Sequence, residues 1–353
     1  MKRHRFAYLL SICSLLLVGC TENDLLNPDT TAEKARVSPI SFSGGHVDHA
    51  TTRHFSALCK HLPTLGVWGW YNGMSENNIQ AFDDQLVAYN ADSAQWEYNP
   101  LQYWNEGCQY NFFAYAPHQQ KTNAEVDIDL TTHMISIKGV TLHGHNLQDY
   151  PSADVKEQFA GTPDTDWMVA RAGQTATGAA GMDVEFMMQH ILGKLNIRIK
   201  ACPDFLKRSH IAAVTADSIV VGALPSQGDF VQQLAHTPII SSPEDAAAEE
   251  WTAHDANLWI KGTHACTLSS DPTYIVESLV IPHHIAASST VVLYYTYHYA
   301  DGHTEECRFS MPLADAFTRF VSGYSHTLTF TVCSERIIFE AGANDWERDT
   351  EKR

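Results

Sequence analysis

The chain is poor in positive charge. Among its 353 residues, 23 are Lys or Arg and 41 are Asp or Glu, so the formal net charge is −18 with histidine neutral. Proteins that bind nucleic acid neutralise phosphates with a surplus of Lys and Arg. The composition therefore argues against nucleic acid as a partner, and a strong negative charge favours a soluble surface that resists self-association.

Known catalytic motifs are missing as well. The sequence contains no GxSxG, no HExxH, no P-loop and no GxGxxG placed between a strand and a helix. Three short histidine clusters could share a metal ion, but the chain has 19 histidines and we interpret these clusters as solvated loop residues. They are HVDH at 46–49, HGH at 143–145 and PHH at 282–284. We therefore predict no enzymatic activity, no cofactor and no metal site.

The sequence lacks an apolar run of the about 20 residues that a membrane-spanning helix needs. Its apolar segment 6–18 has 13 residues and follows the basic residues Lys2, Arg3 and Arg5. This arrangement is typical of a secretory signal peptide. The segment ends in LLVGC, which resembles the lipobox of bacterial lipoproteins. The resemblance implies a signal peptide at 1–19, removed by lipoprotein signal peptidase, and a lipid on Cys20. A plain signal peptide followed by a chance cysteine is the alternative.

Cysteines are few once this leader is removed. Cys13 leaves with the signal peptide and Cys20 carries the lipid, and the loss of three basic residues changes the net charge to −18 − 3 = −21. No CxxC pair remains, so zinc or thioredoxin-type chemistry is unsupported. The remaining six could form disulfides in an exported protein or stay as buried thiols, and the sequence does not choose. They are Cys59, Cys108, Cys202, Cys266, Cys307 and Cys333.

Helical periodicity is weak along the whole chain, whereas short β-type runs bounded by Asn, Pro, Gly or Asp are frequent. The polar residues 20–37 are expected to form a flexible tether. The Gly, Ala and Thr-rich segment 172–182 separates two series of strands, which predicts two β-sandwich domains at 38–182 and 183–353. The expected strands are 65–72, 85–90, 95–100, 108–117, 124–130, 133–142, 184–201, 217–224, 256–262, 274–282, 290–302 and 325–341.

One aromatic pair offers a possible binding surface. Trp68 and Trp70 are two residues apart, so both project from the same face if their segment is a strand. Exposed, they could form a flat platform on which a sugar ring stacks. Buried, they belong to the core, which is the commoner place for large aromatics at alternate strand positions.

Several segments, in a fixed order, resemble the fimbrillin-like pilins of Gram-negative anaerobes, which build type V pili. The similarity extends over nearly the whole chain after the leader, and the stretch 96–118 is its most specific part. The segments are ISFSGG followed by TTR, WEYNPLQYWNEGCQYNFFAYAPH, DWMVARA, VEFMMQHILGKLNIRI, VESLVIPHH, FVSGYSHTLTFTV and IIFEAGANDW. They include His190, Gly323, Tyr324 and Trp346 at positions that match the family pattern.

The resemblance implies a fold and a mode of assembly. Members of this family are exported lipoproteins that fold as two transthyretin-like Greek-key β-sandwiches in tandem. An arginine-specific surface protease removes the first strand, and the C-terminal strand of a neighbouring subunit fills the groove that is left. Such an exchange satisfies exposed backbone groups and apolar side chains together.

Carried onto this chain, the resemblance makes 38–45 the removable strand, with Ile40 and Phe42 facing inward. Cleavage is expected between Arg53 and His54. Arg36 is a competing site, although it precedes the strand, and Arg53 could also be an ordinary surface arginine. The C-terminal segment 336–346 either is donated or stays with its own subunit.

We therefore expect a structural or accessory subunit of a cell-surface fimbria that acts in adhesion. Its partners would be other pilin subunits, the arginine-specific protease, the export machinery and the outer membrane, which it reaches through its lipid. The alternative is a surface lipoprotein that does not polymerise and binds glycans through Trp68 and Trp70.

Overall fold

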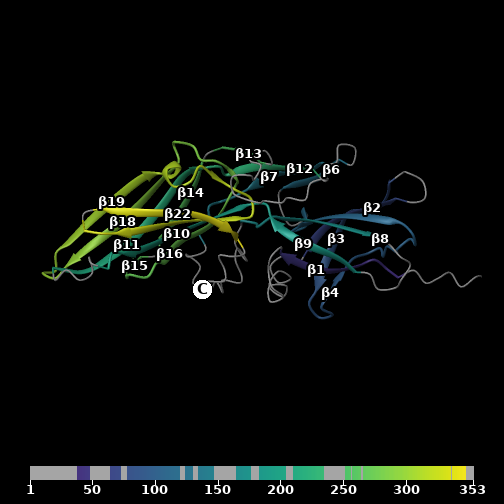
Figure 1. The fold of residues 1–353 in the computed structure, drawn as a ribbon, viewed down its shortest axis with the longest axis horizontal. Coiled ribbons are helices and arrows are strands. Elements are labelled where there is room, and N and C mark those ends of the chain that lie inside the picture. Colours follow the sequence, from purple (N-terminus) through teal and green to yellow (C-terminus); the bar gives the residue numbers. More distant parts are fainter. Residues whose placement is uncertain are drawn as a thin grey trace, which may run out of the picture.

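The protein is built almost entirely from β-strands, as the sequence predicts. The computed structural model describes residues 38–47, 64–72, 78–119, 124–129, 134–146, 164–175, 183–203, 210–233, 251–255, 257–263, 265–334 and 336–346. Within these ranges the molecule is elongated, with the early strands at one end and the late strands at the other (Figure 1). None of the helical segments in these ranges is long and apolar enough to span a membrane.

The first sheet has seven strands, and its two edges approach each other. In sheet order, the strands are β1 (Ser41–Val47), β9 (Asp183–His190), β8 (Met168–Thr175), β5 (Gln109–Ala116), β2 (Thr64–Asn72), β3 (Asn78–Asn90) and β4 (Gln95–Glu97). The backbone N–H of Ile40, just before β1, donates to the carbonyl of Gln102, just after β4, over 2.8 Å. The sheet therefore encloses an apolar core on its inner face, to which Val67, Phe112 and Phe186 contribute.

A second sheet covers the other face of the first one. Its order is β13 (Trp251–His254), β12 (Gln227–Gln233), β7 (Met134–Thr141) and β6 (Glu125–Asp129). It lies in the middle of the molecule (Figure 1). Its residues Ile137 and Phe230 belong to the same buried cluster as Phe113 and Tyr115 of β5. Strands from both halves of the chain therefore build this layer.

Two further sheets form a sandwich at the far end. One contains β16 (Thr273–Val280), β10 (Gly193–Ala201), β21 (Tyr324–Val332) and β22 (Ile337–Asp345), in that order. The other contains β14 (Leu258–Gly262), β11 (Ile211–Leu224), β18 (Thr290–Tyr299) and β19 (Thr304–Pro312), with β15 (Cys266–Thr267) also on β11. A short pair, β17 (His283–His284) with β20 (Arg319–Phe320), and one turn of 3-10 helix at Leu313–Asp315 complete the described elements.

The strict alternation of residues 194–201 explains why this half folds as a sandwich. Leu195, Ile197 and Ile199 are buried on one face of β10, as the period of two in a strand requires. They meet side chains such as Ile219 of β11 in a single buried cluster. The two sheets therefore share one apolar core.

The predicted boundary between residues 182 and 183 does not follow the sheets. β9 belongs to the first sheet, and the chain passes to the C-terminal sandwich only at Ile191 and Leu192, between β9 and β10. Likewise β12 and β13 were expected in the second domain, but β12 pairs with β7 on one side and with β13 on the other. The first residues of the Gly, Ala and Thr-rich segment, 172–175, belong to β8, so the small residues did not mark a change of domain.

A disulfide joins Cys202 to Cys333 across 131 residues of sequence. The two cysteines follow β10 and β21, which are adjacent parallel strands, and the N–H of Cys202 donates to the carbonyl of Val332 over 2.9 Å. Among the other cysteines in the described ranges, three are half-buried free thiols; Cys59 lies outside those ranges. The three are Cys108, Cys266 and Cys307. The structure therefore contains both a disulfide and free thiols, the two possibilities that the sequence left open.

We predict that replacing both Cys202 and Cys333 by Ser lowers the free energy of unfolding of the C-terminal sandwich. In the chain-entropy model, a closed loop of this length contributes up to about 5 kcal/mol by restricting the unfolded chain. Urea denaturation followed by the fluorescence of the C-terminal tryptophans measures the change. Cys108→Ser, at a free thiol of the first sheet, is the control, and an equal effect of both changes contradicts the prediction.

His326 of β21 gives the stability a dependence on pH. Its side chain is buried and packs edge-on against Phe317 and Phe320. Burial lowers the pKa of His326 to about 4, well below its ordinary value of 6.5. Below pH 6.5 the unfolded chain therefore binds a proton that the folded protein excludes, so stability is lost as the pH falls from about 6.5 toward 4.

We expect this histidine to account for roughly 3 kcal/mol of the stability lost between pH 7 and pH 4, from a shift of about 2.5 pH units. Urea unfolding at a series of pH values, compared between the natural protein and His326→Leu, isolates this part. The variant should show a shallower fall over that window. Parallel curves for the two proteins would disprove the assignment.

Candidate functional site

The first strand lies in a groove of the first sheet and is held on both sides. On one side β1 pairs in parallel with β9, from Ser41 opposite Asp183 to Val47 opposite Met188. On the other side, residues 98–104 bond to the chain that enters β1. The hydroxyl of Tyr98 donates to the carbonyl of Ile40 over 2.6 Å. The strand is therefore part of the sheet rather than an appendage.

Two side chains of this segment fill the inner core. Ile40 is 1% exposed and Phe42 is 6% exposed, so the inward orientation predicted for both is confirmed. The Phe42 ring stacks on Phe186 with centroids 5.7 Å apart and meets Phe82 and Tyr98 edge-on at 5.5 Å. Without this strand, the groove would expose these aromatic rings together with the unpaired backbone of β9.

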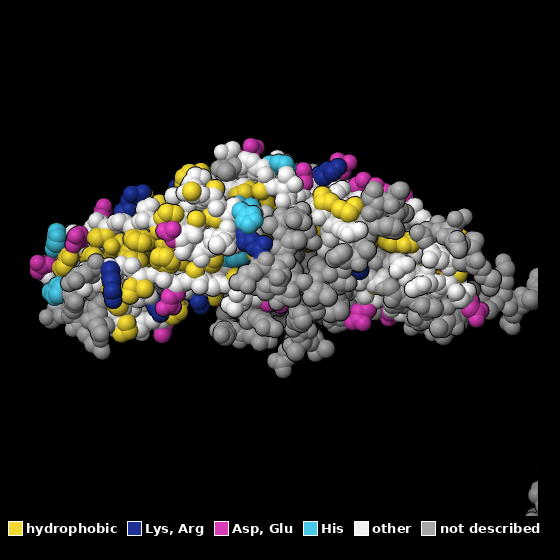
Figure 2. Space-filling view, turned by 45° about the horizontal axis from the view of Figure 1, so that its top comes forward, with side chains coloured by type: hydrophobic (Ala, Val, Ile, Leu, Met, Phe, Trp, Pro, Cys, Tyr) yellow, Lys and Arg dark blue, Asp and Glu magenta, His cyan; other side chains and the backbone are white. Residues whose placement is uncertain are grey.

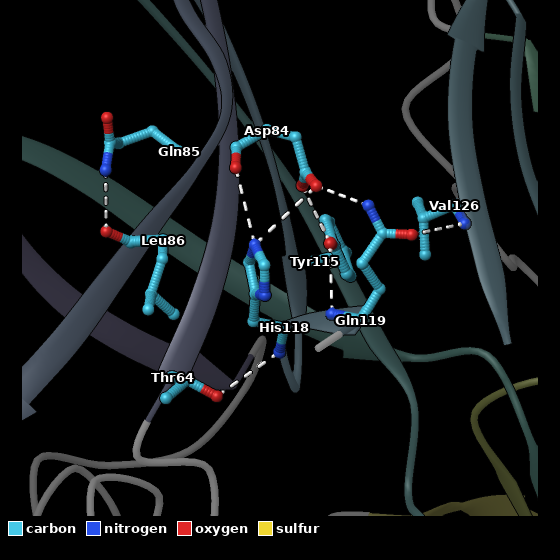
Figure 3. A network of polar contacts seen from close by, with 8 residues as sticks. All are labelled: Thr64, Asp84, Gln85, Leu86, Tyr115, His118, Gln119 and Val126. Atoms are coloured by element: carbon cyan, nitrogen blue, oxygen red, sulfur yellow. Dashed lines mark hydrogen bonds and ion pairs between the residues drawn. The ribbon is translucent and has the colours of Figure 1, made fainter. Parts of the chain in front are cut away.

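A polar network fixes the start of β2, the strand that follows residues 48–63 (Figure 3). The backbone N–H of His118 donates to the hydroxyl of Thr64, the first residue of β2, over 3.3 Å. Asp84, which has a positive φ of 45°, accepts hydrogen bonds from the Tyr115 hydroxyl over 2.8 Å and from the Gln119 amide. Burial raises the pKa of Tyr115 above its ordinary value.

This network has the residue types of an acid–base site, but its polar groups form hydrogen bonds and ion pairs with one another. The His118 ring lies 3.6 Å from a carboxylate oxygen of Asp84, and the Gln119 amide oxygen accepts from the N–H of Val126. The sequence analysis did not predict this network, although the successive aspartates Asp83 and Asp84 inside an apolar strand pattern indicate a bulge. The arrangement holds the start of β2 against the residues that follow β5.

The C-terminal strand β22 is the most exposed part of the far sandwich sheet. Nine residue pairs join it to β21, and it forms the edge of that sheet. Yet Ile338 is 37% exposed and Phe339 is 36% exposed. Figure 2 shows apolar side chains gathered over the half of the molecule built by the late strands. By contrast, Trp346, directly after the strand, is 2% exposed.

The sequence also predicted residues that the structure does not place. The lipid site Cys20, the cleavage pair Arg53 and His54, and the competing Arg36 lie outside the described ranges. These assignments stay predictions.

The structure does not support the aromatic platform considered for Trp68 and Trp70. Trp68 is 6% exposed and packs on Tyr115 and Phe113, with ring centroids 5.3 and 6.3 Å away. Trp70 is half-buried and packs against the same cluster. Both rings face the second sheet of the first half, so they do not offer a shared open surface to a sugar. The pair belongs to the core, and the glycan-binding alternative loses its proposed residues.

Histidines of two of the three clusters, HGH at 143–145 and PHH at 282–284, have partners within the fold, whereas the side chains of HVDH at 46–49 lie outside the described part. His143 and His145 both contact the buried carboxylate of Asp164, at 3.1 and 3.4 Å. The ring of His283 bonds to the carbonyl of Ile281, and burial lowers the pKa of His283. In the part of the chain that the structure describes, no group of three or more His, Cys, Asp or Glu residues is placed to hold a metal ion.

We predict that Phe42→Ala lowers the free energy of unfolding of the first half by about 3–5 kcal/mol, because truncating a buried Phe leaves a cavity. Phe339→Ala is the matched control, since the same change at a ring that is 36% exposed should have a much smaller effect. Urea unfolding of both variants measures the difference. Equal losses would show that β1 contributes little to the core.

Comparison with known proteins places this architecture. A model of the fimbrillin-like family matches residues 59–346. The chain is 23% identical over 208 residues to the fimbrium subunit Fim1C of Phocaeicola vulgatus, an alignment that covers 56% of this chain and about half, 51%, of that protein. A fimbrial protein from Bacteroides vulgatus shares the fold, with a TM-score of 0.59 at 14% identity over 87% of this chain and 99% of that one. The chain belongs to the fimbrillin-like family.

Proposed function

We propose that this protein is a subunit of a cell-surface fimbria that acts in adhesion, and that it assembles by exchanging β1 for the β22 of a neighbouring copy. One observation carries the proposal. β1 fills an aromatic groove with an Ile and a Phe two residues apart, and the exposed edge strand β22 repeats that pattern. Membership of the fimbrillin-like family and the likeness to a fimbrium subunit support the same role.

The two strands can be aligned residue by residue. Residues 39–45 read PISFSGG and residues 336–342 read RIIFEAG. Ile337 then takes the position of Ile40, Phe339 that of Phe42, and a small residue follows two positions later in both. Because strand side chains alternate, Ile337 and Phe339 would enter the groove together.

The exchange is favourable because β22 leaves an exposed position for a buried one. Phe339 is 36% exposed on its own subunit, whereas Phe42 is 6% exposed in the groove. Fully burying a Phe stabilises by roughly 1.5–3 kcal/mol, so this change recovers part of that amount. The donated strand would also take the place of β1 in the backbone pairing with residues 183–188 of β9.

Proteolysis after Arg53 supplies the trigger in this proposal. The cut lies in residues 48–63, which connect β1 to β2, so it would leave β1 held only by non-covalent contacts. The network around Asp84 anchors Thr64, so the first residue of β2 should stay in place after the cut. Before the cut, β1 blocks the groove, and a lipid on Cys20 would hold the precursor at the outer membrane. The role is structural rather than enzymatic.

We expect an arginine-specific protease to release the segment that ends at Arg53 and to produce SDS-resistant ladders of the remaining chain. Arg53→Ala should stay monomeric under the same treatment, because β1 stays covalently attached. Mass spectrometry of the cleaved chain and unheated SDS gels measure both steps. Arg36→Ala is the control and should assemble normally. Normal assembly of Arg53→Ala, or a cleanly cut natural chain that stays monomeric, would refute the trigger.

The strand register has its own test. Phe339→Ser should be cleaved normally but assemble poorly, because it removes the ring that would fill the site of Phe42. Ile338→Ser is a matched control, since Ile338 is equally exposed and its new side chain copies Ser41 of β1. Unheated gels after cleavage compare the two. Equal assembly of both variants would refute this register.

A further inference from the structure

β9 lies between β1 and β8 in the first sheet. Six residue pairs join β9 to β1, from Asp183 to Met188. On its other side β9 pairs with β8, through Met168 with His190 and Val169 with Gln189. The loss of β1 would therefore remove six backbone pairs from the strand that ends in His190.

The last residue of β9, His190, contacts Trp346, which directly follows β22. The rings of His190 and Trp346 stack with centroids 4.1 Å apart and planes 16° apart. An oxygen of Asp166 lies 2.9 Å from the ring nitrogen of His190 and orients it. Trp346 is almost fully buried, and its backbone N–H donates to the carbonyl of Gly323 over 3.0 Å.

The other side of Trp346 is supported by a buried ion pair. The ammonium of Lys194, on β10, lies 5.7 Å from the centre of the Trp346 ring. It pairs with Glu277 of β16 over 2.6 Å, and both side chains are 2% exposed. The backbone N–H of Glu277 in turn donates to Asn146 over 2.9 Å. Trp346 therefore packs against side chains of both the first sheet and the far sandwich.

Among residues 336–346, Trp346 is the one deeply buried residue. Most of β22 is exposed, and its ladder with β21 runs along a sheet edge. A strand of that kind opens readily unless one of its ends is held. Trp346, which directly follows Asp345, holds that end.

We propose that Trp346 and His190 form a latch that keeps β22 on its own subunit, and that the loss of β1 opens this latch through β9. Removal of β1 takes six backbone pairs from β9, which loosens the strand that carries His190, and the stack of His190 on Trp346 weakens. β22 is then released in the same molecule whose groove has just been vacated. The link to fibre growth rests on the proposed function, but the latch itself is a property of one molecule.

Hydrogen exchange of the dilute, uncleaved full chain, measured by mass spectrometry on peptides that cover 337–345, tests the latch directly. Trp346→Ala should speed exchange in these peptides roughly tenfold or more, since large buried aromatics are among the costliest residues to truncate. His190→Ala should act in the same direction, and Trp346→Phe, which keeps a ring in the pocket, should act less. Trp259→Ala is the control, because Trp259 is 58% exposed on the opposite sheet.

Peptides from β10 and β11 report whether a variant is folded, and they should exchange slowly in every case. Unchanged exchange of β22 in both Trp346→Ala and His190→Ala, with the core intact, would overturn the latch. If the core peptides of Trp346→Ala also exchange fast, that variant is not properly folded. The exchange of β22 in His190→Ala then decides whether the latch exists.

The coupling to β1 is tested by the same peptides after treatment with the arginine-specific protease at a dilution that keeps chains monomeric. Release of β1 should speed exchange in 337–345, and Phe42→Ala should do so to a smaller extent. Slow exchange of β22 after β1 is gone would overturn the coupling. Fast exchange in a chain that never polymerises would support the latch and refute strand exchange, so the two proposals fail separately.

Discussion

The fold depends on how the groove beside β9 is filled. Phe42 lies among four aromatic rings on the inner face of the first sheet, and the strand that carries it pairs with six residues of β9. An empty groove would expose a strand edge and an apolar surface together, a combination that folded proteins avoid. Whatever chain occupies it must therefore be a strand with large apolar side chains at alternate positions.

The far sandwich presents the complementary feature. β22 is an edge strand whose apolar side chains are partly open to solvent, which is unfavourable for an isolated molecule. Trp346, directly after this strand, belongs to the same buried apolar cluster as the sandwich core and also lies against His190 and Lys194. The ion pair of Lys194 with Glu277 is expensive to desolvate, so it adds specificity to this pocket more than stability. The molecule thus holds a filled groove at one end and a loosely held strand at the other.

Local patterns were sufficient for part of this picture. Alternation predicted many of the strands and the buried face of β10, because the period of two depends only on neighbouring residues. The inward faces of Ile40 and Phe42 came from the family resemblance. Pairing over long distances could not be predicted in the same way. The parallel pairing of β1 with β9, the joining of β7 with β12 and the bond between Cys202 and Cys333 each link residues about 90 to 140 positions apart. The network around Asp84 depends on a strand bulge that the pattern of residues 78–90 obscured.

The most direct measurement is disulfide trapping across the proposed contact between subunits. In the precursor, Ser41 lies opposite Asp183, and the proposed register puts Ile338 of a neighbouring copy in the place of Ser41. A chain with Asp183→Cys and a second chain with Ile338→Cys should therefore crosslink only after cleavage, and peptide mapping should find the bond between positions 183 and 338. Assembled material that forms no such bond would contradict the exchange of β1 for β22.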